Sequence, residues 1–143
     1  MPVRSLGSSI LRWPDSEQVH KALSRWTRGL AQRRQDLLAV AYIGSYARGD
    51  WGVGSDIDLL VIVEHNDQPF HKRGLDFDLS ELPVPTDLLV YSLQEWRAMT
   101  REGSRFFRTA STEGVWLVDR SGLKLSGESA FGSTTNRLGA SES

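Results

Sequence analysis

Two short apolar runs limit the fold of this chain more than any other feature. Leu37–Ile43 (LLAVAYI) and residues 57–64 (IDLLVIVE) are rich in Leu, Ile and Val, and polar or glycine residues bound each run. Runs of this length and composition are typical of buried β-strands. They are also far too short to cross a lipid bilayer. We therefore expect a sheet whose strands are covered by other elements of the chain.

The rest of the sequence supplies those elements. Apolar residues recur at helical spacing over residues 19–30, directly after Asp15 and Ser16, which are good N-cap residues. Further along, we expect an irregular segment over 65–85, a strand over 86–91, a helix that Ser92 caps, a helical segment over 104–112 and a strand over 115–118. This order predicts an α/β (α+β) fold in which helices pack against a small mixed β-sheet.

The chain has 143 residues, which is the size of one domain. We assign residues 1–120 to that domain. Residues 121–143 contain six serines and four glycines, a composition typical of a flexible tail, so we expect the folded core to end near Arg120.

Composition and charge exclude several functional classes. The chain has 17 Lys and Arg residues against 18 Asp and Glu residues, so it carries no strong signal for nucleic-acid binding. Cysteine is absent, which excludes disulfides, thiol catalysis and thiolate zinc sites. We find no membrane-spanning run and no secretory signal at the N-terminus, and we expect a cytoplasmic protein.

Three aspartates form the first candidate functional group. Asp56 and Asp58 are two residues apart at the start of an expected strand, so their side chains should project from the same face. Asp87 lies near the start of the next expected strand, and all three carboxylates converge if these strands are neighbours. Clustered carboxylates repel one another unless a cation lies among them, and oxygen ligands favour Mg²⁺ or Mn²⁺. We therefore interpret Asp56, Asp58 and Asp87 as metal ligands and catalytic residues.

A second group precedes the aspartates. Gly44 and Ser45 follow the first apolar run, where a strand gives way to a short helix, and backbone N–H groups at such a junction can bind phosphate. Arg48 lies one turn further and carries a guanidinium that could bind the same phosphates. A phosphate-binding turn beside a carboxylate cluster is suited to phosphoryl or nucleotidyl transfer.

These residues resemble those of a known family. The segments Gly44-Ser-Tyr-Ala-Arg-Gly49, Ser55-Asp-Ile-Asp-Leu59 and Thr86-Asp-Leu-Leu-Val-Tyr91 are similar to motifs of the DNA polymerase beta nucleotidyltransferase superfamily, in particular its minimal nucleotidyltransferases. The resemblance covers roughly residues 37–91. It implies the nucleotidyltransferase fold, with Gly44 and Ser45 holding the triphosphate of an NTP and Asp56, Asp58 and Asp87 binding two Mg²⁺ ions.

The same resemblance implies an activity and a partner. It implies that the chain transfers an NMP group from an NTP, which we expect to be ATP, to a hydroxyl acceptor and releases pyrophosphate. Minimal nucleotidyltransferases resemble antitoxins of HEPN-domain toxins, some of which modify the toxin itself. A HEPN-domain partner protein is therefore expected.

Two other interpretations remain open at this point. In the first, the chain is a binding module that keeps the fold and acts mainly by association with a partner. In the second, it is a homodimeric enzyme that modifies a small molecule such as an antibiotic. A homo-oligomer would fit the second interpretation.

Two further features of the sequence are not assigned to the site. Asp76-Phe-Asp78 repeats the Asp-x-Asp pattern without a Gly-Ser pair at the right distance, so we reject it as a site. Trp51 lies between the two candidate groups and is assigned no role.

Overall fold

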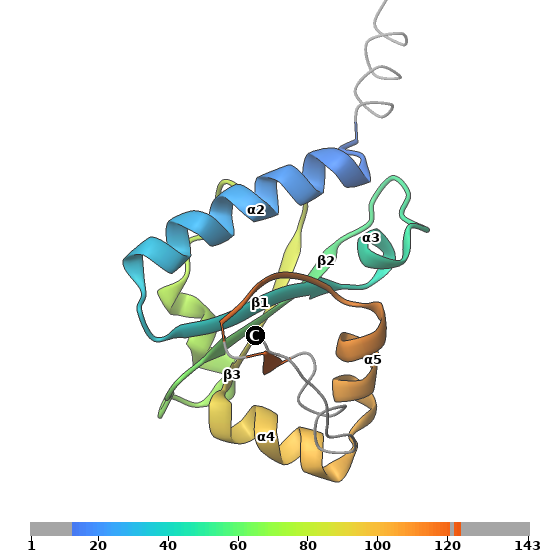
Figure 1. Ribbon diagram of the computed structural model, residues 1–143. Helices are drawn as coiled ribbons and strands as arrows, with labels where there is room; N and C mark the ends of the chain where they lie inside the picture. Colours follow the sequence, from blue (N-terminus) through green and yellow to red (C-terminus); the bar gives the residue numbers. More distant parts are fainter. Residues whose placement is uncertain (1–12, 121, 124–143) are drawn as a thin grey trace, which may run out of the picture.

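The computed structural model describes residues 13–120, 122 and 123 (Figure 1). The elements follow in the order α2 (Ser16–Arg33), β1 (Leu37–Ile43), α3 (Ser45–Arg48), β2 (Ile57–Val63), the 3₁₀ helix η1 (Phe70–Asp76), β3 (Thr86–Ser92), α4 (Leu93–Glu102), α5 (Arg105–Glu113) and β4 (Val115–Asp119). The expected order of strands and helices is confirmed apart from η1, which was not expected, and the bounds of the strands differ from the expected ones by at most one residue.

The four strands form one mixed sheet in the order β3-β2-β1-β4. β1 lies in the middle and runs antiparallel to both β2 and β4, whereas β2 and β3 are parallel. Every residue of β1 is buried. A strand with neighbours on both sides and helices on both faces has no solvent-exposed face, which explains its continuous apolar run.

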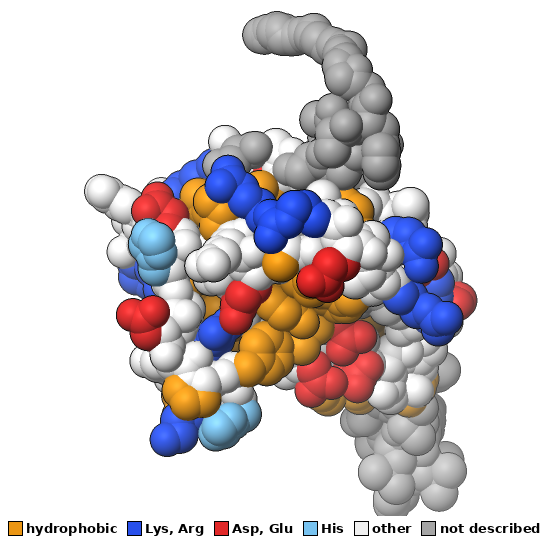
Figure 2. Space-filling model, turned by 90° about the horizontal axis from the view of Figure 1, so that it is seen from below, with side chains coloured by type: hydrophobic (Ala, Val, Ile, Leu, Met, Phe, Trp, Pro, Cys, Tyr) orange, Lys and Arg blue, Asp and Glu red, His pale blue; other side chains and the backbone are white. Residues whose placement is uncertain are grey.

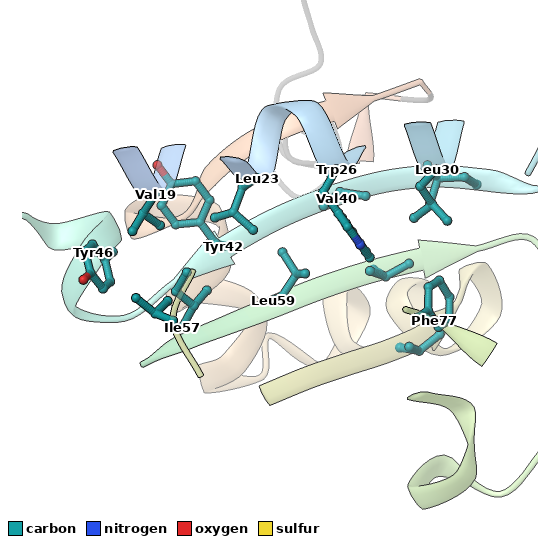
Figure 3. Packing of buried hydrophobic residues seen from close by; sticks show 14 of the residues in the cluster. Val19, Leu23, Trp26, Leu30, Val40, Tyr42, Tyr46, Ile57, Leu59 and Phe77 are labelled. Atoms are coloured by element: carbon teal, nitrogen blue, oxygen red, sulfur yellow. The ribbon is translucent and has the colours of Figure 1, made fainter. Parts of the chain in front are cut away.

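Helix α2 covers one face of the sheet (Figure 1). Asp15 caps its N-terminus by accepting a hydrogen bond from Gln18 N, and Gln18 reaches back to the Asp15 N–H, forming a capping box. Apolar side chains of α2 then pack against β1 and β2 (Figure 3); the cluster includes Val19, Leu23, Trp26, Leu30, Val40, Tyr42, Ile57 and Leu59. The apolar residues that recur at helical spacing in the sequence thus form the face of α2 that contacts the sheet.

Helices α4 and α5 lie on the opposite face of the sheet. Ser92 and Ser104 cap their N-termini. The core on this side is built around Trp96, which is fully buried and contacts Phe107 and Trp116 edge to face.

The segment 65–85 is more ordered than the sequence suggested. It contains η1, and Arg73 within it is only 6% exposed. The Arg73 guanidinium binds Glu95 through Nη1 at 2.6 Å and Nη2 at 3.0 Å, and it also donates to the carbonyls of Val90 and Gln68. The buried Arg73 side chain therefore holds η1 and its flanking residues against β3 and α4. The expectation of an irregular segment was wrong for residues 70–76, because a tertiary contact holds them.

The core also extends slightly past the expected end at Arg120. Leu123 is buried, and its carbonyl accepts a hydrogen bond from Trp96 Nε1 at 3.4 Å. The rest of the predicted tail lies outside the described residues, so the domain boundary stays a prediction. No helix within the described part of the chain is long and apolar enough to span a membrane.

Candidate active site

Strand pairing brings two of the three aspartates together. β2 and β3 are parallel, and Asp58 lies directly opposite Asp87 in their register. Ile57 and Leu59 belong to the α2 side of the core, so Asp58 projects from the other face. Leu88 and Val90 pack on the same α2 side, which places Asp87 on the same face as Asp58. The predicted convergence of Asp58 and Asp87 is therefore present in the fold.

Asp56 adds to the negative charge around Asp58. Asp58 is half-buried, whereas Asp56 and Asp87 are exposed. Burial, and then the carboxylates of Asp56 and Asp87, raise the pKa of Asp58 above its ordinary value. Each of these causes disfavours the ionised form. Figure 2 shows acidic side chains gathered on one face of the molecule, beside a hydrophobic surface.

The Gly-Ser turn lies next to the same carboxylate. Gly44 has φ 101° and ψ −159°, a conformation that only glycine adopts readily. A β-carbon added at Gly44 would lie 3.6 Å from Asp58 Oδ2, so the backbone of this turn passes close to the carboxylate. Ser45 follows as the first residue of α3 and is half-buried. The geometry brings Gly44 and Ser45 to the edge of the aspartate group, as predicted.

Arg48 is exposed at the end of α3 and is held by acidic residues. Its Nε lies 3.2 Å from Asp50 Oδ2, and its Nη1 lies 3.8 Å from Glu113 Oε1 at the end of α5. The pairing with Glu113 links α3 to α5 beside the site. The sequence analysis missed Glu113, and no local pattern marks it, because the contact joins segments far apart in the chain.

Trp51 packs against the α3 segment. Its ring stacks on Tyr46 with the centroids 5.4 Å apart and the planes 8° from parallel. Tyr46 is buried, and its hydroxyl donates a hydrogen bond to the carbonyl of Pro14 at 2.8 Å. Trp51 therefore stabilises the turn that carries Gly44 and Ser45.

The donor set at this site suits a hard divalent cation, because it consists of carboxylate oxygens that repel one another in the absence of positive charge. Within the described residues, however, no group of three or more His, Cys, Asp or Glu side chains is arranged so that it could hold a metal ion. The carboxylates of Asp56 and Asp87 are thus close enough to raise the pKa of Asp58, but the three side chains are not arranged as a set of metal ligands. Their chemistry nevertheless fits a hard divalent cation.

The rejected Asp-x-Asp pair lies elsewhere. Asp76 and Asp78 line a cavity of about 380 Å³ against α2, together with Trp26 and Arg33. This cavity is on the α2 side of the sheet, opposite the face from which Asp58 projects. The pair therefore provides a matched control for the candidate site.

Comparisons with known proteins identify the family and the fold. The family model described as a nucleotidyltransferase domain matches residues 24–110. A protein from Sulfolobus solfataricus considered to be a nucleotidyltransferase has a similar fold, with a TM-score of 0.54 and 21% identity over 73% of this chain and 84% of that chain. A toxin-antitoxin structure with AMP-PNP gives a TM-score of 0.51 and 18% identity over 76% of this chain and 86% of that chain.

No curated protein matches the chain significantly. The two structures support the fold, and the family model covers more than half of the sequence, including both candidate groups. The chain therefore belongs to the nucleotidyltransferase domain family, whose members catalyse nucleotidyl transfer.

Proposed function

We propose that this protein is a Mg²⁺-dependent enzyme that transfers an NMP group from an NTP to a hydroxyl acceptor. The observation that carries the proposal is the register of β2 and β3, which sets Asp58 opposite Asp87 and next to the turn at Gly44. This reaction needs a turn that binds phosphate and a group of carboxylates close to it, and here both lie at the same end of neighbouring strands.

Each residue has a defined role in this proposal. Gly44 and Ser45 bind the triphosphate through the backbone and hydroxyl of the turn, and Arg48 adds a guanidinium from the end of α3. Asp56 and Asp58 are the residues that would hold Mg²⁺, and Asp87 would share it. The bound metal would neutralise phosphate charge and make the acceptor hydroxyl more acidic.

Asp87 also orients the acceptor. The hydroxyl oxygen attacks the α-phosphorus, the bond from that phosphorus to the bridging oxygen of the β-phosphate breaks, and pyrophosphate leaves. The hydroxyl proton passes to the Asp87 carboxylate and then to solvent. One phosphorus–oxygen bond forms as one breaks, so no oxidant or further reactant is needed.

We also propose ATP as the NTP and a toxin of the HEPN class as the protein partner. The toxin-antitoxin structure with a similar fold contains AMP-PNP, an ATP analogue, which supports an adenine nucleotide. The partner follows from the resemblance of the motifs to minimal nucleotidyltransferases. A nucleotidyltransferase that acts as an antitoxin would have to recognise its partner next to the site.

Isothermal titration tests the nucleotide site without knowledge of the acceptor. ATP, CTP, GTP and UTP are titrated into the protein with Mg²⁺ and then with EDTA. The variant Asp56→Asn/Asp58→Asn should lose Mg²⁺-dependent binding. The control Asp76→Asn/Asp78→Asn removes the same charge on the opposite face and should bind as the wild type does.

The results also separate the remaining interpretations. Tightest binding of ATP would support the adenine nucleotide. Wild-type affinity in Asp56→Asn/Asp58→Asn would contradict the assignment of these carboxylates. Absence of binding to all four nucleotides would favour a module that acts by association alone.

A further inference from the structure

The guanidinium of Arg48 contacts two carboxylates from different parts of the chain. Its Nε donates a hydrogen bond to Asp50 Oδ2 at 3.2 Å, and its Nη1 lies 3.8 Å from Glu113 Oε1. The second distance is too long for a hydrogen bond, so Arg48 and Glu113 attract one another through their charges. A guanidinium has five N–H donors, of which the hydrogen bond to Asp50 uses one. Arg48 can therefore keep both acidic contacts and still donate to a phosphate.

Glu113 is itself fixed by the residue that follows it. The N–H of Gly114 donates to the carbonyl of Ala110 at 3.1 Å at the end of α5. A β-carbon added at Gly114 would lie 2.5 Å from that carbonyl oxygen and 3.2 Å from Ile43 Cγ2, so only glycine fits here. The end of α5 is thus packed tightly against Ile43, which immediately precedes Gly44.

These contacts form a closed circuit around the turn that is proposed to bind phosphate. From Ile43 the chain passes through Gly44 and α3 to Arg48, whose N–H donates to the carbonyl of Gly44 at 3.0 Å. Arg48 contacts Glu113, and Gly114 packs back against Ile43. Figure 1 shows the end of α5 next to α3 and β1. The Arg48 side chain is therefore held by its own helix and by α5.

We propose that Glu113 is a positioning residue that orders the Arg48 guanidinium for the triphosphate. This inference rests on the proposed function, in which Arg48 binds the NTP, and adds a residue to that site. The Arg48 side chain is 46% exposed, so without an ion pair it would populate many rotamers. Ordering such a side chain when the nucleotide binds lowers the affinity, and a contact that orders it beforehand removes this cost.

The charge of Glu113 has an opposite effect, because it repels the triphosphate. This repulsion is weak for two reasons. The Glu113 side chain is 43% exposed, so water and salt screen it, with a Debye length of about 8 Å at physiological ionic strength. The adjacent guanidinium of Arg48 also offsets the carboxylate charge. We therefore expect the ordering of Arg48 to outweigh the repulsion.

A double-mutant cycle on nucleotide affinity tests this role. ATP is titrated with Mg²⁺ in 0.15 M salt into the wild type, Glu113→Gln, Arg48→Gln and the double variant. Glu113→Gln keeps the shape of the side chain, and its loss of charge should weaken binding about fivefold. Arg48→Gln should weaken binding at least tenfold. In the double variant, Glu113→Gln should have no further effect, since no guanidinium remains to be ordered.

Glu102→Gln is the matched control. Glu102 is exposed at the end of α4, just before α5 begins, so this change removes the same charge from the same layer of helices and should leave ATP binding unchanged.

Three results would overturn the inference. These are wild-type or tighter binding in Glu113→Gln, an equal loss from this change with and without Arg48, and a similar loss in Glu102→Gln. Melting temperatures of all variants show whether each remains folded, and a purely structural role of Glu113 would lower stability without the coupling to Arg48. Wild-type protein that does not bind ATP would instead contradict the proposed function, and with it the role of Arg48 on which the inference rests.

Discussion

Replacing Asp58 by Asn should stabilise the metal-free protein. Asp58 is half-buried between Asp56 and Asp87, and these surroundings raise its pKa. The ionised carboxylate is therefore less favourable in the folded chain than in the unfolded chain. Asn has almost the same shape and no charge, so it removes the repulsion and leaves the packing unchanged.

The size of the effect follows from Coulomb repulsion between neighbouring carboxylates and its screening by solvent. Carboxylates about 6 Å apart repel by about 0.7 kcal/mol at the dielectric constant of water and by about 2.8 kcal/mol at an effective value of 20. Because Asp56 and Asp87 are exposed, solvent and salt screen the repulsion and the lower value applies better. We expect Asp58→Asn to raise the free energy of unfolding by about 1 kcal/mol, or the melting temperature by about 4 °C.

The sign of the pH dependence is fixed by the direction of the pKa shift. In the wild type, the folded chain keeps the Asp58 proton at a pH where the unfolded chain has lost it, so stability falls as pH rises from the ordinary pKa of 3.8 through the raised pKa. The advantage of Asp58→Asn should therefore be absent well below pH 3.8 and complete above the raised pKa.

Thermal melts of wild type and Asp58→Asn across this pH range, without metal and then with Mg²⁺ and ATP, measure the effect. Ligand should reverse the order, because the wild type gains about 2.7 kcal/mol at a ligand concentration of 100 times Kd and the variant does not. Asp78→Asn is the control, since a hydrogen bond from Ser80 lowers the pKa of Asp78 and its removal should bring no gain. Equal melting temperatures for wild type and Asp58→Asn at neutral pH would refute the clustering of the carboxylates.

Two further substitutions test the turn and the loop. Gly44→Ala should cost about 1 to 3 kcal/mol of stability and abolish ATP binding. Its control is Gly49→Ala, which is also at positive φ but has open space around it. Gly49→Ala should cost similar stability and, by titration, bind ATP as the wild type does. Arg73→Met should lower the free energy of unfolding by about 2 kcal/mol in urea titrations at pH 7, because it leaves Glu95 without its buried partner. Arg73 lowers the pKa of Glu95, so this loss should shrink as pH falls below the ordinary value of 4.5, and a loss that does not change with pH would contradict the ion pair as its cause.

Much of the fold could be predicted because local signals agreed with tertiary packing. The bounds of β1 coincide with the apolar run Leu37–Ile43, since both faces of this central strand are covered. Asp15, Ser92 and Ser104 cap the helices at whose starts they were expected. A cap requires only a side-chain oxygen next to the first turn, so the local sequence is enough to indicate it.

Long-range contacts could not be predicted in the same way. Arg73 looks like a surface residue in the sequence, and only its contacts with β3 and α4 explain its burial. The contact of Arg48 with Glu113, and those of Tyr91 with Phe70 and Phe106, depend likewise on how distant segments meet. The convergence of Asp58 with Asp87 was conditional on β2 and β3 being neighbours, which the sheet confirms.

The most direct test of the site is a crystal structure with Mn²⁺ and AMP-PNP, in which anomalous scattering locates the metal. We predict anomalous peaks among the carboxylates of Asp56, Asp58 and Asp87, with the triphosphate at Gly44 and Ser45. Peaks confined to another part of the chain, such as Asp76 and Asp78, or nucleotide bound away from Ser45, would contradict the account.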